Sequence, residues 1–131
     1  MAFAQTGGIE KFNSCFLLAL KDIAEKNGWQ HAASLLYDNG TKDAYYPESR
    51  FKGYKNNRIR FLLSTFLRCR KFNTIIIGHI NLAILALAVR FFFPRKKVIM
   101  ILHGVEVMEP VGGIRKMALH RCSQLIAVSR F

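Results

Sequence analysis

Apolar residues follow two alternating patterns along the chain, short continuous runs and helical spacing. The clearest run covers residues 98–102 and ends abruptly at His103 and Gly104. A run this short and this apolar predicts a strand over 97–102 that is buried on both faces. The Ile75-Ile76-Ile77 run predicts a second buried strand over 72–78.

Segments with helical periodicity lie between these runs. The expected helices cover residues 8–26, 55–71, 81–93 and 114–121, and the remaining expected strands cover 2–5, 30–37 and 124–128. Residues 38–53 lack periodicity and contain Asn39-Gly40 and Pro47, so they are expected to form a loop. Strands that alternate with helices predict an α/β fold, a Rossmann-like parallel sheet of about five strands flanked by helices.

The two ends of the sequence suggest a larger protein. The expected first strand is very short, and the sequence stops at the junction between the last strand and a following helix. A parallel sheet normally has both faces covered by helices. We therefore expect residues 1–131 to be one domain of a longer chain.

The charge of the chain restricts its partners more than its fold. Twenty Lys and Arg against eight Asp and Glu give a formal net charge of +12, which points to an anionic membrane, nucleic acid or a phosphorylated ligand. The three cysteines are far apart and form no CxxC pair, so a zinc site or disulfide framework is not expected. The apolar segment 80–89 is about half the length of a bilayer span and is expected to be a core helix.

The basic excess is concentrated between residues 49 and 105, which include twelve Lys or Arg and no Asp or Glu. In the expected helix 55–71, Ile59, Leu62, Leu63 and Phe66 share one face, whereas Arg60, Phe61, Arg68 and Lys71 fall on the opposite side. An outward Phe among basic residues is typical of a helix that contacts an anionic membrane. The alternative is a basic face that is only exposed to solvent. The sequence contains no RNP-like motif, so nothing but the charge supports binding to nucleic acid.

Two histidines follow the two buried strands directly. His79 and His103 are expected at the same edge of a parallel sheet, together with the Gly7-Gly8 turn, because ligands bind outside the carboxyl ends of the strands. Either imidazole suits a general base or a hydrogen bond to a sugar or phosphate, and the glycines suit a phosphate. A simple tight turn and a histidine that satisfies local hydrogen bonds are the alternatives. His31 and His120 are expected to be structural or surface residues.

Four segments resemble one family, the GT-B retaining glycosyltransferases of family 4. They are GGIEKFN at 7–13, IIIGHINL at 75–82, HGVEVMEP at 103–110 and QLIAVSRF at 124–131. These segments are similar to the family's glycine loop, third strand, His-Gly loop and the strand that ends in a helix-opening serine. They follow the family's order and extend over essentially the whole chain.

The resemblance implies the N-terminal, acceptor-side domain of such an enzyme. It implies that Gly7 and Gly8 lie against the diphosphate of a nucleotide-sugar donor and that His103 is the catalytic-site histidine. His79, Glu106 and Ser129 are expected on the acceptor side of the cleft. The expected acceptor is a saccharide or a lipid-linked saccharide. No metal or other cofactor is expected, because a helix dipole and basic groups can neutralise the diphosphate.

Some family members dock on anionic membranes through a basic patch of this domain. The resemblance therefore implies a cytoplasmic protein at the inner face of a membrane, with Arg60, Phe61, Arg68 and Lys71 as the contact, and no nucleic-acid partner. The chain departs from the family at Met108, where Trp is common. It also lacks the two glutamates eight residues apart that mark the C-terminal donor domain. Residues 1–131 alone are therefore expected to be inactive. The alternative is a non-catalytic Rossmann-like module that binds anionic membrane or nucleic acid.

Overall fold

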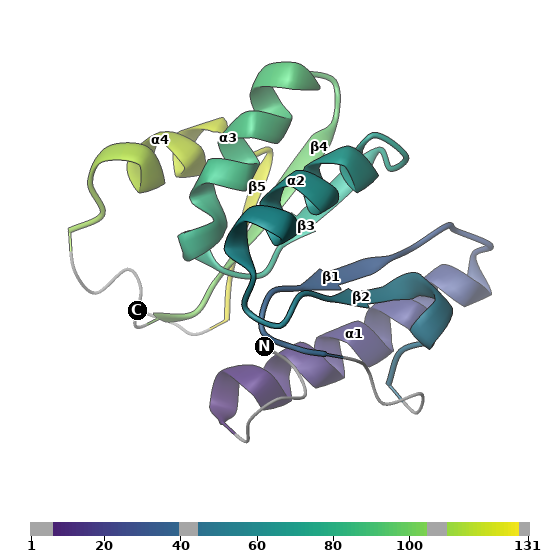
Figure 1. Ribbon diagram of the computed structural model, residues 1–131. Coiled ribbons are helices and arrows are strands. Elements are labelled where there is room, and N and C mark those ends of the chain that lie inside the picture. Colours follow the sequence, from purple (N-terminus) through teal and green to yellow (C-terminus); the bar gives the residue numbers. More distant parts are fainter. Residues whose placement is uncertain (1–6, 40–44, 105–109, 129–131) are drawn as a thin grey trace. The chain divides into compact units, whose positions relative to one another are not determined.

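The computed structural model describes residues 7–39, 45–104 and 110–128, which form a mixed α/β structure (Figure 1). The helices are α1 (Gly8–Lys26), α2 (Arg58–Cys69), α3 (Ala83–Phe92) and α4 (Gly113–Arg121), with short 3-10 helices η1 (Glu48–Arg50) and η2 (Ile80–Leu82). The strands are β1 (Ala33–Leu35), β2 (Phe51–Gly53), β3 (Thr74–Ile77), β4 (Lys97–Leu102) and β5 (Gln124–Ala127). The chain divides into two compact units, Met1–Thr65 (unit 1) and Phe66–Phe131 (unit 2).

Unit 1 contains a parallel pair of strands, β1 and β2, in which Ala33 lies opposite Phe51. A buried cluster forms beside this pair from residues of α1, of the strands and of the segment before η1: Leu17, Ala33, Tyr46 and Phe51. Gly53 ends β2 so close to the backbone of Asp38 that a methyl group there would overlap the Asp38 carbonyl. Only a glycine leaves room for this approach.

Unit 2 contains the three-stranded parallel sheet β3-β4-β5. The central strand β4 places Ile99 opposite Ile76 of β3 and Gln124 of β5. Most residues of β4 are buried, and α3 packs against both β4 and α4. Burial on both faces is the arrangement predicted from the apolar run, so the prediction of a strand over 97–102 is confirmed.

The prediction of one sheet of about five strands is wrong for the described residues, where five strands divide into sheets of two and three. The expected strand 30–37 shortens to Ala33–Leu35, and the expected loop 38–53 contributes β2. Three-residue strands are too short to show a periodicity of two, which is why β2 was missed. The expected strand 2–5 lies outside the described residues, and the single domain over 1–131 stays a prediction.

The apolar segment after β3 is a core helix, as predicted. Ala83, Leu85, Ala86 and Val89 of α3 are buried at helical spacing. Among the described residues, no helix combines the length and the apolar character needed to cross a bilayer.

Candidate functional site

The carboxyl ends of β3 and β4 bring two histidines together in unit 2. His79 follows β3 and His103 follows β4 directly, and the centroids of their imidazole rings lie 6.1 Å apart at an interplanar angle of 39°. The prediction that both strand-end histidines lie at one edge of the sheet is therefore confirmed. The pairing follows from the parallel register, because adjacent parallel strands end on the same side.

Hydrogen bonds assign a tautomer to each imidazole. His103 Nε2 lies 3.0 Å from the carbonyl oxygen of Gly78, so this nitrogen carries a proton and donates it. His79 Nδ1 accepts a hydrogen bond from the backbone N–H of Asn81 at 3.1 Å. In these tautomers His79 Nε2 is a donor and His103 Nδ1 is an acceptor. A hydroxyl group both donates and accepts, so it is complementary to such a pair.

Arg115, near the start of α4, is linked to the histidine pair by a hydrogen bond to Asn81. Arg115 Nη2 donates to the side-chain oxygen of Asn81 at 2.9 Å, and Asn81 is the residue whose N–H contacts His79. Arg115 and Asn81 are exposed, whereas His103 is only 6% exposed. Sequence reasoning missed both residues. Arg115 lies 34 positions from Asn81, and no local pattern predicts such a contact.

The predicted diphosphate site, Gly7 and Gly8, lies at the start of α1 in unit 1. Gly7 is the N-cap residue, in an extended conformation, and Gly8 is the first helical residue. A methyl group at Gly7 would overlap the carboxylate of Glu10, so this acid lies beside the turn that was expected to hold phosphate. A common cleft of this turn with the histidines stays a prediction. Glu106 and Ser129, the other expected cleft residues, fall outside the described residues.

The structure corrects the predicted face of α2. Phe61 is 2% exposed and packs edge-on against Tyr54, with ring centroids 5.3 Å apart, so the prediction of an outward Phe61 is wrong. The exposed apolar row is Ile59, Leu63 and Leu67, at 74%, 63% and 58% exposure, although two of these were expected inside. Phe61 turns inward because Tyr54 offers a partner for its ring. Nothing in the periodicity of the helix identifies that partner.

The basic residues predicted on α2 differ in their surroundings. Arg60 and Lys71 are exposed, and Arg68 is partly buried. The membrane contact that these residues were expected to make stays a prediction.

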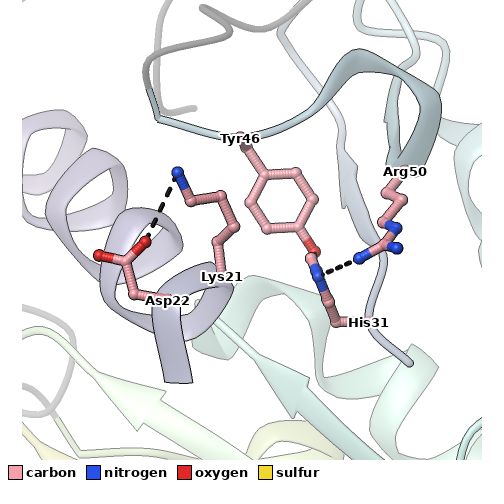
Figure 2. Close-up of polar contacts among 5 residues, drawn as sticks. All are labelled: Lys21, Asp22, His31, Tyr46 and Arg50. Atoms are coloured by element: carbon pink, nitrogen blue, oxygen red, sulfur yellow. Dashed lines mark hydrogen bonds and ion pairs between the residues drawn. The ribbon is translucent and has the colours of Figure 1, made fainter. Parts of the chain in front are cut away.

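A second polar cluster lies in unit 1, where His31, Tyr46 and Arg50 point toward one another (Figure 2). Arg50 Nη1 donates to His31 Nε2 at 2.5 Å, so the other ring nitrogen, Nδ1, carries the proton and donates it to Tyr46 Oη at 2.6 Å. Desolvation and the nearby Arg50 charge lower the pKa of His31. His31 is therefore a buried neutral residue. The structural role expected for His31 stays a prediction, and His120 is exposed on α4, which fits the expectation of a surface residue.

No group of three or more His, Cys, Asp or Glu residues within the described ranges could hold a metal ion. Comparison with protein-family models, with curated proteins and with solved structures found no match to this chain.

Proposed function

We propose that residues 1–131 form the acceptor-side half of a GT-B retaining glycosyltransferase of family 4. The observation that carries this proposal is the His79–His103 pair at the carboxyl edge of a parallel sheet, 6.1 Å between ring centroids. Ligands of open α/β sheets bind at this edge. The four family-like sequence segments support the same conclusion, and two of them contain these histidines.

Each group has a physical role in transfer from a nucleotide sugar. His103 Nδ1, an acceptor in the tautomer set by Gly78, orients the reacting hydroxyl of a saccharide or lipid-linked acceptor. His79 forms the adjoining wall of the site. Gly7 and Gly8 provide backbone N–H groups to the diphosphate, which gains negative charge as it leaves. A further domain would complete the donor site, and residues 1–131 alone would be inactive.

The test compares variants of His103 in the full-length protein. In His103→Gln, the Gln amide can still donate to the Gly78 carbonyl, but the imidazole is absent. We expect this change to lower kcat/KM for sugar transfer by about 100-fold or more while the unfolding midpoint changes little. His120→Gln, at an exposed histidine of α4, is the matched control and should be silent. Equal turnover in His103→Gln and the wild type would remove His103 from the mechanism.

We further propose that the protein works at the cytoplasmic face of an anionic membrane. The exposed row Ile59, Leu63 and Leu67 lies on a helix that also exposes Arg60, and Lys71 is exposed just after it. An apolar row among basic groups suits a lipid surface, where apolar side chains enter the headgroup region and cations meet anionic lipids. The apolar row favours a membrane over nucleic acid as the partner. A membrane is also one of the two partners of the alternative, a non-catalytic Rossmann-like module that binds anionic membrane or nucleic acid.

Vesicle binding tests the membrane contact. Leu63→Gln with Leu67→Gln should reduce cosedimentation with phosphatidylglycerol vesicles by about tenfold or more. Arg60→Gln with Lys71→Gln should weaken binding less, by about 1 kcal/mol for each charge removed, and this loss should shrink as the salt concentration rises. Leu82→Gln, at a half-buried leucine outside α2, is the comparison for a general loss of apolar surface. Retained binding in the leucine double variant would reject α2 as the contact.

A further inference from the structure

Unit 2 carries positive charge that its own described residues do not neutralise. Residues 66–104 and 110–128 contain no Asp or Glu. Two of their half-buried cations bond to carbonyl oxygens instead: Arg90 Nη1 donates to Pro94 O at 2.8 Å, and Lys96 Nζ donates to Arg70 O at 3.0 Å. A carbonyl satisfies an N–H group without cancelling the charge of its side chain. The field of this unit therefore attracts anions.

One of these cations is linked to the histidine pair through Asn81. Arg115 Nη2 bonds to Asn81 Oδ1, Asn81 N bonds to His79 Nδ1, and the His79 ring lies beside His103. These contacts form a continuous series from an exposed guanidinium to a buried imidazole. A guanidinium has five N–H donors, and Asn81 takes one of them. Asn81 thus fixes the direction of the side chain and leaves its charge intact.

We propose that Arg115 binds a phosphate group of the substrate, with Asn81 as the positioning residue. A guanidinium matches phosphate with two parallel hydrogen bonds, and the two imidazoles to which Asn81 links it match a hydroxyl group. The ligand therefore combines a phosphate with a nearby hydroxyl, as in a sugar phosphate or a phosphate-linked acceptor. This assignment deepens the proposed function and rests on it for the identity of the substrate. Binding of the phosphate itself does not depend on sugar transfer.

The phosphate could belong to the acceptor or to the donor diphosphate, so the test uses two probes. Glucose 6-phosphate and UDP are titrated separately into the full-length protein, and the imidazole resonances of His79 and His103 are followed by NMR. Arg115→Gln should weaken binding of one probe by about tenfold or more, because a charge-assisted pair is lost. A loss for glucose 6-phosphate, which is not a fragment of the donor, assigns the acceptor, and a loss for UDP assigns the donor.

Two further variants separate the side chain from the general charge. Arg121→Gln removes an exposed arginine from the other end of α4 and should change either affinity by less than about twofold. Asn81→Asp keeps the shape of the contact but pairs Arg115 with a carboxylate, so it should weaken binding about as much as Arg115→Gln. Unchanged affinity in Arg115→Gln, or an equal loss in Arg121→Gln, would overturn the inference.

The two proposals fail in different ways. Phosphate binding that depends on Arg115 in a protein without sugar transfer would remove the glycosyltransferase proposal and retain this site. If the wild type transfers sugar and Arg115→Gln leaves both kcat/KM and phosphate affinity unchanged, the glycosyltransferase proposal is retained and the phosphate site at Arg115 is removed.

Discussion

Two helices of this protein open with the same three residues and then differ in charge. Helix α1 begins Gly7-Gly8-Ile9-Glu10, and α4 begins Gly112-Gly113-Ile114-Arg115. The Glu10 carboxylate lies over Gly7, whereas Arg115 reaches outward to Asn81. A glycine pair therefore marks where a helix starts. The two starts differ at the third residue after the first glycine. In α1 this residue is Glu10, whose negative charge lies at the helix N-terminus, and in α4 it is Arg115, whose positive charge attracts anions.

The same contrast extends to the arginines of the two units. Arg50 of unit 1 donates to His31, a buried residue of its own fold, so this cation serves the architecture. Arg115 of unit 2 contacts an exposed asparagine beside the histidine pair. Changes to the unit 1 cluster should therefore reduce stability, and changes at the unit 2 edge should reduce binding. The following predictions test the unit 1 side of this division, in order of decreasing effect on stability.

The largest effect is expected for Tyr46→Ala. The side chain is 0% exposed and packs in the cluster with Leu17 and Phe51. Removal of a buried aromatic ring leaves a cavity and costs about 3–5 kcal/mol in the free energy of unfolding. Urea unfolding measures the change, and Tyr37→Ala, at a more exposed tyrosine, should cost much less. A loss under about 1 kcal/mol would show that this cluster does not hold unit 1 together.

A smaller effect is expected for Tyr46→Phe, which keeps the ring and removes the hydroxyl. His31 Nδ1–H would lose its acceptor at 2.6 Å in a buried place, at a cost of about 1–3 kcal/mol. Tyr37→Phe is the matched control and should stay within about 0.5 kcal/mol of the wild type. Equal stabilities of the two variants would contradict the role of the His31–Tyr46 bond.

The pH dependence of stability follows from the lowered pKa of His31. Burial first and the Arg50 charge second hold this pKa below 6.5 in the folded state. As pH falls below 6.5, the unfolded chain takes up the proton before the folded chain does, so stability falls until the folded-state pKa is passed. Unfolding curves at pH 7.5 and 5.5 measure the loss. The His31→Gln variant should lose less stability between these two values than the wild type.

The structure of unit 2 could be predicted from the sequence better than that of unit 1. The strand over 97–102 and the meeting of His79 with His103 could be predicted, because a continuous apolar run and parallel pairing leave few alternatives. Strand β2 could not be predicted, because a strand of three residues that ends in glycine is too short to show the alternation of apolar and polar residues. Nor could the face of α2 be predicted, because large apolar side chains lie on both sides of that helix, Ile59 and Leu63 on one side and Phe61 on the other. The position of Tyr54 determines that Phe61 turns inward.

The candidate site, too, could be predicted only in part from the sequence. His79 and His103 are visible because each follows its own strand, whereas Asn81 and Arg115 meet only through the packing of α4 beside α3. Arg115 resembles any other basic residue of a +12 chain until that contact is known. A sequence can therefore indicate an edge where ligands bind, but the charged group that completes the edge comes from tertiary packing.

The smallest effect on stability is expected for Glu10→Gln, and it bears directly on the two helix starts. The negative charge of Glu10 in the first turn of α1 interacts favourably with the helix dipole, so its removal should cost about 0.3–1 kcal/mol. The same change should strengthen UDP binding severalfold if Gly7 and Gly8 hold a diphosphate, because a like charge beside the turn is gone. Isothermal titration of the full-length protein measures the affinity. Glu25→Gln, near the other end of α1, should alter neither the affinity nor, beyond a few tenths of a kcal/mol, the stability. Weaker UDP binding in Glu10→Gln would mean that the Glu10 carboxylate contacts the ligand directly. The two helix starts would then both bind a ligand, through a carboxylate in α1 and through a guanidinium in α4.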